Sequence, residues 1–252
     1  MAKKVLITGA SSGIGREFAK VFDSYGCELI ITARRTDRLQ ELADSLSGTP
    51  RIISGDICGA EGARELYEMT KDENIDILIN NAGFGVWGDF SETSCDREVE
   101  MIRLNVETMH VLFKLFLEDF KKRDSGKILN VASMAGFAPG PYMAAYYASK
   151  AYVLRLTQSV AHELKEAHSA VTVSALCPGP VDTEFNDVAG VHFATPSLSS
   201  DYVAKYAVTN LVKGKTVIIP GAGMKYMAAI SKITPDKAAA AVTAQVQKRK
   251  MK

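Results

Sequence analysis

The stretch YYASKAY, residues 146–152, brings two tyrosines and a lysine close together along the chain. If the stretch is helical, Lys150 follows Tyr146 by four residues and Tyr147 by three, so either phenol can share a helix face with the lysine. An ammonium group stabilises a neighbouring phenolate, and a tyrosine activated in this way can give or take a proton. The spacing leaves both tyrosines open as the acid–base residue. Chance pairing on a surface helix is the alternative.

A glycine-rich segment, TGASSGIG at residues 8–15, follows an apolar run and opens a helical pattern. Gly9, Gly13 and Gly15 allow the backbone to turn tightly and to approach a pyrophosphate, which the positive end of a helix attracts. The spacing TGxxxGxG differs from the more common GxGxxG fingerprint. Its place between a strand and a helix nevertheless predicts a nucleotide site.

The end of the second apolar run indicates which nucleotide binds. Proteins that bind NAD place an acidic residue about twenty positions beyond the glycines, where it accepts hydrogen bonds from the ribose. Here the residues nineteen and twenty positions after Gly15 are Arg34 and Arg35. Guanidinium groups bind a phosphate through charge-assisted hydrogen bonds, so the sequence predicts NADP or NADPH. Asp37 is the one nearby acid that complicates this prediction, and arginines that merely extend into solvent are the alternative.

Seven short runs rich in Val, Ile and Leu alternate with segments of helical periodicity. Strands that are apolar on both faces are typical of a parallel sheet covered by helices. We therefore expect one α/β domain with a Rossmann-type, doubly wound, seven-stranded parallel sheet, with its body in residues 1–220. The runs are KVLIT, CELIIT, RIIS, IDILIN, GKILNVA, VTVSALCP and KTVIIP.

Residues 221–252 form a basic tail that we expect to be helical and to belong to the same domain. The tail holds seven Lys and Arg and one acid, a charge of +6, which leaves −5 on the body of a chain whose net charge is +1. A solvated helix is the favoured interpretation, and contact with a membrane surface or an acidic ligand is the less favoured one. The near-neutral chain gives no reason to expect a nucleic-acid partner.

The four cysteines are scattered, without a CxxC pair or a histidine at metal-ligand spacing, so no metal site is expected. No run reaches the roughly eighteen apolar residues that a membrane span requires. The apolar run at the start is too short for a signal sequence. With reduced thiols, these features predict a cytoplasmic protein.

Six motifs follow one another along the chain: TGASSGIG, NNAG at 80–83, Asn105 in LNV, Ser133 in VASMAG, YYASK, and PGPVDT at 178–183. Together they resemble the short-chain dehydrogenase/reductase family over residues 4–220, near the acyl and steroid ketoreductases. The family pattern YxxxK selects Tyr146, thirteen residues after Ser133, and leaves Tyr147 a packing role.

The resemblance implies the catalytic roles. Tyr146 would protonate a carbonyl oxygen as hydride arrives from the cofactor, and Ser133 would hold that oxygen. Lys150 would grip the nicotinamide ribose and, with the bound cofactor, lower the pKa of the phenol by about 2–3 units from its usual value near 10. Asn105 would orient a water that links Lys150 to solvent.

The resemblance also assigns cofactor contacts. Asp56 would meet the adenine, Thr183 would contact the nicotinamide carboxamide, and the NNAG residues would run beside the cofactor or serve to join strands. The full set expected at the cofactor is Gly9, Ser11, Ser12, Gly13, Ile14, Gly15, Arg34, Arg35, Asp56, Ile57, Asn81, Ala82, Gly83, Tyr146, Lys150, Pro178, Gly179, Val181 and Thr183.

An irregular segment, residues 184–200, is expected to cover the substrate. The aromatic and apolar residues near the site predict a small apolar ketone, aldehyde or acyl-type carbonyl as substrate. Dehydrogenation of hydroxy acids or 3-hydroxy amino acids is a second possibility, and a non-catalytic dinucleotide sensor is a remote third. The long helical segments 98–120 and 143–167 suit a homodimer, with a homotetramer as the alternative. The expected pocket residues are Phe84, Trp87, Met134, Phe137, Tyr142, Met143, Phe185 and Phe193.

Overall fold

The computed structural model describes residues 2–185, 189–190 and 197–248. Strands and helices alternate from the N-terminus, as the hydrophobic periodicity predicts. The strands are β1 (Lys4–Thr8), β2 (Glu28–Ala33), β3 (Arg51–Ser54), β4 (Ile77–Asn80), β5 (Lys127–Val131), β6 (Thr172–Leu176), β7 (Val181–Asp182), β8 (Leu198–Ser199) and β9 (Val217–Ile218). The α-helices are α1 (Gly13–Ser24), α2 (Thr36–Asp44), α3 (Gly59–Thr70), α4 (Cys95–Ile102), α5 (Met109–Lys122), α6 (Ala144–Glu166), α8 (Ser200–Val212), α9 (Ala222–Ser231) and α10 (Asp236–Lys248).

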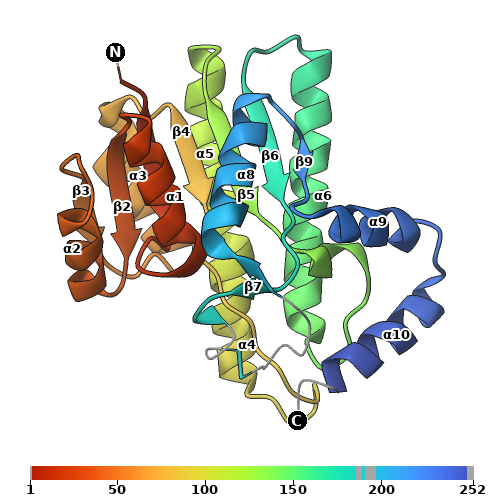
Figure 1. Cartoon of the computed structure of the whole chain (residues 1–252). Coiled ribbons are helices and arrows are strands. Elements are labelled where there is room, and N and C mark those ends of the chain that lie inside the picture. The colour runs from red at the N-terminus through yellow and green to blue at the C-terminus, as the bar shows by residue number, and fades with distance from the viewer. Residues whose placement is uncertain (1, 186–188, 191–196, 249–252) are drawn as a thin grey trace.

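Seven strands form one parallel sheet in the order β3-β2-β1-β4-β5-β6-β9, which confirms the predicted Rossmann-type sheet (Figure 1). The chain builds outward from β1 to β3 and then returns to place β4 on the other side of β1. Ligands of such sheets bind at this reversal, outside the carboxyl ends of the strands. In Figure 1 these ends point toward the edge where β7, α4 and α10 lie.

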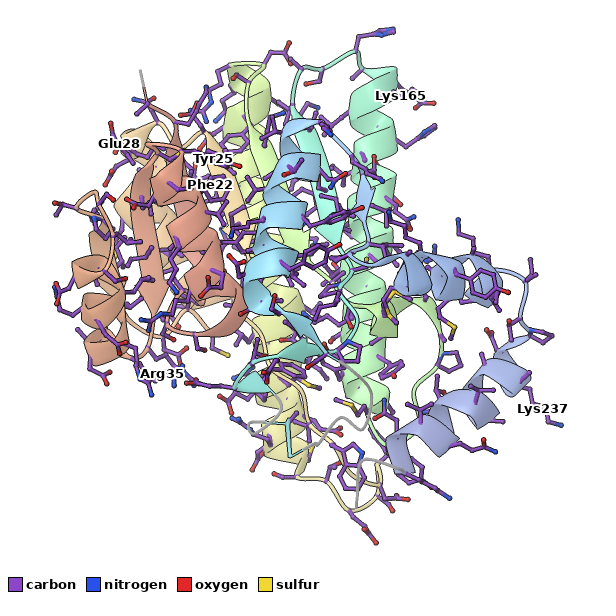
Figure 2. All side chains as sticks on the ribbon, viewed as in Figure 1. Phe22, Tyr25, Glu28, Arg35, Lys165 and Lys237 are labelled. Atoms are coloured by element: carbon purple, nitrogen blue, oxygen red, sulfur yellow. The ribbon has the colours of Figure 1, made fainter. Side chains whose placement is uncertain are left out.

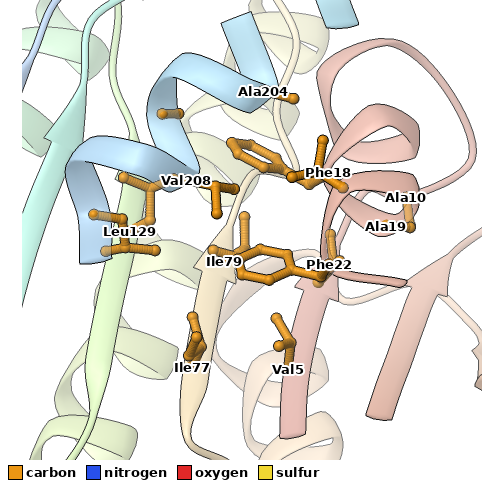
Figure 3. Packing of buried hydrophobic residues seen from close by; sticks show 14 of the residues in the cluster. Val5, Ala10, Phe18, Ala19, Phe22, Ile77, Ile79, Leu129, Ala204 and Val208 are labelled. Carbon is orange, nitrogen blue, oxygen red and sulfur yellow. The ribbon is translucent and has the colours of Figure 1, made fainter. Parts of the chain in front are cut away.

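Two hydrophobic cores cover the two faces of the sheet. Alternate side chains of β1 point to opposite faces, so Val5 and Ile7 join one cluster and Leu6 joins the other. On the first face, Phe18 and Phe22 of α1 pack over the sheet beside α8 (Figure 3). Helices α3, α5 and α6 cover the second face. Burial on both faces explains why the strand sequences are almost entirely apolar.

The basic tail differs from the expected single solvated helix. It forms two helices, α9 and α10, which are separated around Pro235 because a proline disfavours helical geometry in the residue before it. Helix α10 returns toward the carboxyl ends of the strands, where the Thr243 hydroxyl donates a hydrogen bond to the carbonyl of Pro139 over 2.7 Å. Lys237, at the start of α10, points outward (Figure 2). The tail therefore has one solvated face and one face turned to the body.

Within the described ranges, none of the helices combines the length and the apolar character needed to span a membrane.

Candidate active site

A single cavity of about 640 Å³ at the carboxyl ends of the strands gathers nearly all the predicted site residues. These residues come from seven separate stretches of the chain, which only the folded sheet brings together. The predicted residues that line the cavity are Gly9, Ser11, Ser12, Gly13, Ile14, Arg34, Arg35, Asp56, Ile57, Asn81, Ala82, Gly83, Ser133, Tyr146, Lys150, Pro178, Gly179, Val181 and Thr183. Among the predicted catalytic and cofactor-binding residues, Gly15 and Asn105 are the two that do not line it in the described chain.

The backbone at Gly9 and Gly13 forms a hollow, called the glycine cradle below, that side chains at these positions would fill. Gly9 and Gly13 have φ values of +69° and +54°, a conformation that L-residues rarely adopt. A Cβ on Gly9 would lie 2.9 Å from the Cα of Ala82. A Cβ on Gly15, which does not line the cavity in the described chain, would lie 2.3 Å from the Gly9 carbonyl oxygen. Gly15 therefore lets α1 begin directly against the loop.

Asn81 of the NNAG motif holds the glycine loop in place. Its Nδ2 donates hydrogen bonds to the carbonyl oxygens of Thr8, at 2.9 Å, and Gly9, at 3.2 Å. The preceding Asn80 donates across the sheet to the Oδ1 of Asn130 at 2.9 Å. The motif thus joins strands and also lines the cavity, and its contact with the cofactor stays a prediction.

Arg35 lies at the carboxyl end of β2 (Figure 2), and its guanidinium already holds a carboxylate. Its Nη2 donates to the Oε2 of Glu184 at 2.8 Å and to the Ser11 hydroxyl at 3.2 Å. Arg38 approaches the other Glu184 oxygen at 3.7 Å. The hydrogen bond from Arg35 lowers the pKa of Glu184. Arg35 and Arg38 thus face one carboxylate together, an arrangement of guanidinium groups that also suits a phosphate.

Arg34 occupies a separate position, with its Nη1 3.3 Å from the Oε1 of Glu100. Asp37, the acid that complicated the prediction of NADP, lies in the first turn of α2. It is absent from the cavity lining of the described chain.

The three catalytic candidates meet at the centre of the cavity. Tyr146 and Lys150 lie one turn apart on α6, and Ser133 follows β5. Both α6 side chains are buried, with 8% and 5% of their surface exposed. The Nζ of Lys150 donates to the carbonyl of Val131 at 2.8 Å and lies 5.8 Å from the centroid of the Tyr146 ring. The residue spacing along α6 and the position of β5 in the sheet therefore bring the Tyr146 phenol, the Lys150 ammonium group and the Ser133 hydroxyl together.

Burial controls the ionisation of these groups. It lowers the pKa of Lys150 to about 8, because the ammonium ion loses its hydration. It raises the pKa of Tyr146, and a hydrogen bond with the Ser133 side chain opposes that rise only in part. The expected lowering of the phenol pKa concerns Lys150 together with the bound cofactor and stays a prediction; in the protein alone, the cost of burying a phenolate raises the pKa of Tyr146.

Asn105 lies behind the site in a π-helical turn, Arg103–Thr108, that joins α4 to α5. Its amide accepts a hydrogen bond from the Phe84 backbone N–H at 3.1 Å and donates to the Phe84 carbonyl at 2.9 Å. It also donates to the Ser149 hydroxyl at 3.2 Å. Asn105 thereby fixes the loop after β4 against α6, and a link to water stays a prediction.

The apolar end of the cavity contains five of the eight expected pocket residues, namely Phe84, Met134, Phe137, Met143 and Phe185. Trp87 and Tyr142 instead stack on each other, with ring centroids 6.4 Å apart, and do not line the cavity in the described part of the chain. Phe193 lies outside the described residues, as does most of the segment expected to cover the substrate.

The tail supplies cavity residues that the sequence analysis missed. They are Met224, Met227, Ser231, Val242, Thr243, Val246 and Gln247. A Cβ on Gly179 would lie 2.5 Å from the Met224 sulfur, so α9 packs directly on the PGPVDT loop. The apolar pair Val242 and Val246, one helical turn apart, was the sequence signal that could have indicated a buried face on this helix. A single apolar pair is too weak to show which surface that face covers.

Comparison with known proteins agrees with this geometry. Residues 3–190 match the short chain dehydrogenase family. An uncharacterised oxidoreductase of Staphylococcus epidermidis is 34% identical over 188 residues, which span 73% of this chain and 80% of the relative.

Two solved structures share the fold over most of their length. A short-chain dehydrogenase of Sphingobium yanoikuyae in complex with NADPH is 30% identical, with a TM-score of 0.82 over 92% of this chain and 93% of that one. A bulky-bulky ketone specific alcohol dehydrogenase of Comamonas testosteroni is 28% identical, with a TM-score of 0.79 over 92% and 91%. With its glycine cradle and its Ser–Tyr–Lys centre, this chain belongs to the short-chain dehydrogenase/reductase family of oxidoreductases, which use a nicotinamide dinucleotide.

Proposed function

We propose that the protein reduces the carbonyl group of a small, largely apolar molecule with NADPH, and that Tyr146 is the general acid. One observation carries the proposal. Ser133, Tyr146 and Lys150 lie where the polar end of the cavity, next to the glycine loop, meets an apolar end lined by aromatic and methionine side chains. A carbonyl group on an apolar body fits that junction.

The residues present fit NADP. The glycine cradle at Gly9 and Gly13 accommodates a pyrophosphate at the start of α1, and the guanidinium groups of Arg35 and Arg38 lie beside an anion at the end of β2. That anion is the Glu184 carboxylate, and we infer that the phosphate on the adenosine ribose of NADP would replace it. The NADPH complex of the Sphingobium yanoikuyae relative supports the same choice.

When bound, the nicotinamide supplies the hydride for the carbonyl carbon. The Ser133 hydroxyl binds the carbonyl oxygen, and Tyr146 donates its phenolic proton to that oxygen as negative charge develops there. Burial raises the pKa of Tyr146 in the protein alone, so the phenol carries its proton at neutral pH, as a general acid must before the reaction. Lys150, fixed by the Val131 carbonyl, places positive charge near the phenolate that proton donation leaves behind.

The cavity lining favours a neutral ketone or aldehyde over a hydroxy acid. The cations that line the cavity in the described chain are Arg34, Arg35 and Lys150, which belong to the cofactor end and to the catalytic centre. The apolar end offers no cation there for a substrate carboxylate. The ketone named for the Comamonas testosteroni relative agrees with this choice.

The test compares Tyr146→Phe with Tyr152→Phe, using 4-phenylbutan-2-one and following NADPH consumption by absorbance. Tyr152 lies on the same helix, but its hydroxyl bonds His110 at the surface, at 2.7 Å. Removing the general acid should lower kcat by roughly 10²- to 10⁴-fold, and NADPH binding, measured by calorimetry, should be retained. Tyr152→Phe should keep wild-type turnover.

A wild-type protein that binds NADPH tightly but reduces no carbonyl compound would favour the dinucleotide-sensor alternative. Equal turnover by the wild type and by Tyr146→Phe would rule out the assigned acid.

A further inference from the structure

A second polar pair lies in the otherwise apolar end of the cavity. The Nε2 of Gln247, on α10, donates a hydrogen bond to the Tyr147 hydroxyl, on α6, over 2.7 Å. Both side chains line the cavity. Gln247 keeps only 1% of its surface exposed, whereas the other residues of α10 are half-buried or exposed.

The pair has hydrogen-bonding capacity left over. The Oε1 of Gln247 is buried and finds no partner among the described residues. The Tyr147 hydroxyl accepts from Gln247, and its own O–H has no acceptor within the described part of the chain. A buried acceptor without a partner costs free energy comparable to a lost hydrogen bond. One free acceptor and one free donor side by side complement a hydroxyl group, which both donates and accepts.

The surroundings fix the pair in position. The Tyr147 ring packs against the Gly140 backbone so closely that a Cβ there would lie 2.2 Å from the ring. One turn before Gln247, the Thr243 hydroxyl anchors α10 to the carbonyl of Pro139 at 2.7 Å. The loop before α6 thus holds both partners. Burial raises the pKa of Tyr147, so its phenol keeps the donor proton at neutral pH.

The other cavity hydroxyls contributed by the tail are already satisfied. Ser231 donates to the carbonyl of Ala228 at 2.9 Å, and Thr243 donates to backbone carbonyls. Among the described residues at the apolar end, the free hydrogen-bond donor and acceptor are therefore those of Tyr147 and Gln247.

We propose that Tyr147 and Gln247 form a subsite for a neutral hydroxyl group on the substrate, apart from the carbonyl that is reduced. The proposal rests on the proposed carbonyl reduction and narrows its substrate class to hydroxy ketones with a compact apolar body. The rings of Tyr146 and Tyr147 have centroids 6.3 Å apart, so one small molecule can reach both sites. A carboxylate is disfavoured, because a deprotonated oxygen cannot donate to Oε1 and the described residues that line this end of the cavity include no cation.

The experiment compares kcat/KM for matched ketones in wild type, Gln247→Met and Tyr147→Phe. The probes are 4-(4-hydroxyphenyl)butan-2-one and its 3-hydroxy isomer, the 4-methyl analogue of the same size, and the 4-carboxylate analogue. Gln245→Met is the matched control, because Gln245 lies on the exposed face of the same helix. Both variants at the subsite keep the size of the original side chain but remove one polar partner.

We expect the wild type and Gln245→Met to prefer the better hydroxy ketone over the methyl analogue by roughly 10- to 100-fold. Gln247→Met and Tyr147→Phe should reduce that preference to near unity by losing activity on the hydroxy ketone alone. A preference that persists in both variants, an equal loss for both probes, or a preference for the carboxylate that depends on Gln247 would overturn the proposal.

A binding measurement separates this inference from the proposed reaction. If the wild type reduces none of the ketones, the proposed function fails, and calorimetric binding of the same probes to the protein with NADP present then tests the subsite. A hydroxyl preference in binding that disappears in Gln247→Met supports the subsite, and its absence in the wild type overturns it. Turnover of the methyl ketone without any hydroxyl preference overturns the subsite and leaves the reductase intact.

Discussion

The two ends of the cavity are constructed in different ways. The cofactor end uses short turns that directly follow β1 to β4, and in the first of them Gly9 and Gly13 adopt positive φ values. The substrate end uses side chains from segments far apart in the chain, such as Tyr147 and Gln247, which are 100 positions apart. Local sequence therefore encodes the first end, whereas packing of distant helices creates the second.

Glu184 connects the two ends. It follows the PGPVDT motif at the start of the segment expected to cover the substrate, yet its carboxylate binds Arg35 and Arg38 at the cofactor end. We expect cofactor phosphate and the Glu184 carboxylate to compete for the same cations. Changes confined to one end should therefore reveal how independent the two ends are.

The largest effect is expected from a change in the glycine cradle. Gly9→Ala should lower the free energy of unfolding for two reasons. An alanine in the left-handed conformation costs about 1–2 kcal/mol. The overlap of its Cβ with Ala82 costs about 1–3 kcal/mol more. Gly26→Ala is the control, because Gly26 has a similar φ of +70° with nothing within 4 Å of the added Cβ. Urea unfolding measures both, and equal losses would show that the close approach to Ala82 is unimportant.

A change at Arg35 should affect only the cofactor end. Arg35→Ser removes a charge-assisted contact, so NADPH should bind roughly 10- to 100-fold more weakly while NADH binding stays the same. Titration with each cofactor, followed by calorimetry, makes the comparison. A wild-type protein that binds NADH as tightly as NADPH would contradict the phosphate site.

Lys150 lies between the two ends, and its burial predicts a pH dependence of stability. The pKa of Lys150 is about 8 in the folded protein and 10.5 for a free lysine, so the folded state binds fewer protons between these values. The free energy of unfolding should therefore rise with pH in this window, by about 1 kcal/mol from pH 7 to 9. Lys150→Met should lack this rise. The same slope in both proteins would show that the lysine is not desolvated.

The smallest effect is expected where the two ends meet. Glu184→Gln removes the carboxylate that competes for Arg35, and exposed ion pairs of this kind contribute about 0.2–1 kcal/mol. NADPH should therefore bind roughly 2- to 5-fold more tightly to this variant. Glu41→Gln, which breaks the pair with Arg16 elsewhere on the surface, should leave binding unchanged. Weaker NADPH binding to Glu184→Gln would mean that Glu184 supports the phosphate site.

Much of the fold could be predicted because its signals are local. The seven apolar runs lie in the seven strands of the sheet, and the glycine loop lies between β1 and α1, where strand and helix periodicities placed it. The four-residue spacing of Tyr146 and Lys150 placed them on one helix face. The assignment of Trp87 and Tyr142 to the pocket was wrong, because an aromatic residue near a site packs equally well against another aromatic residue.

The sequence by itself determined the order of the strands and helices, the glycine cradle, and the residue types at the catalytic centre, since these depend on backbone geometry and short-range spacing. Only the tertiary structure decided that α10 folds over the cavity and that Gln247 is buried against Tyr147. It also decided that the pKa of Tyr146 rises in the protein alone. Burial depends on which distant surfaces come together, and no local pattern in the chain specifies that.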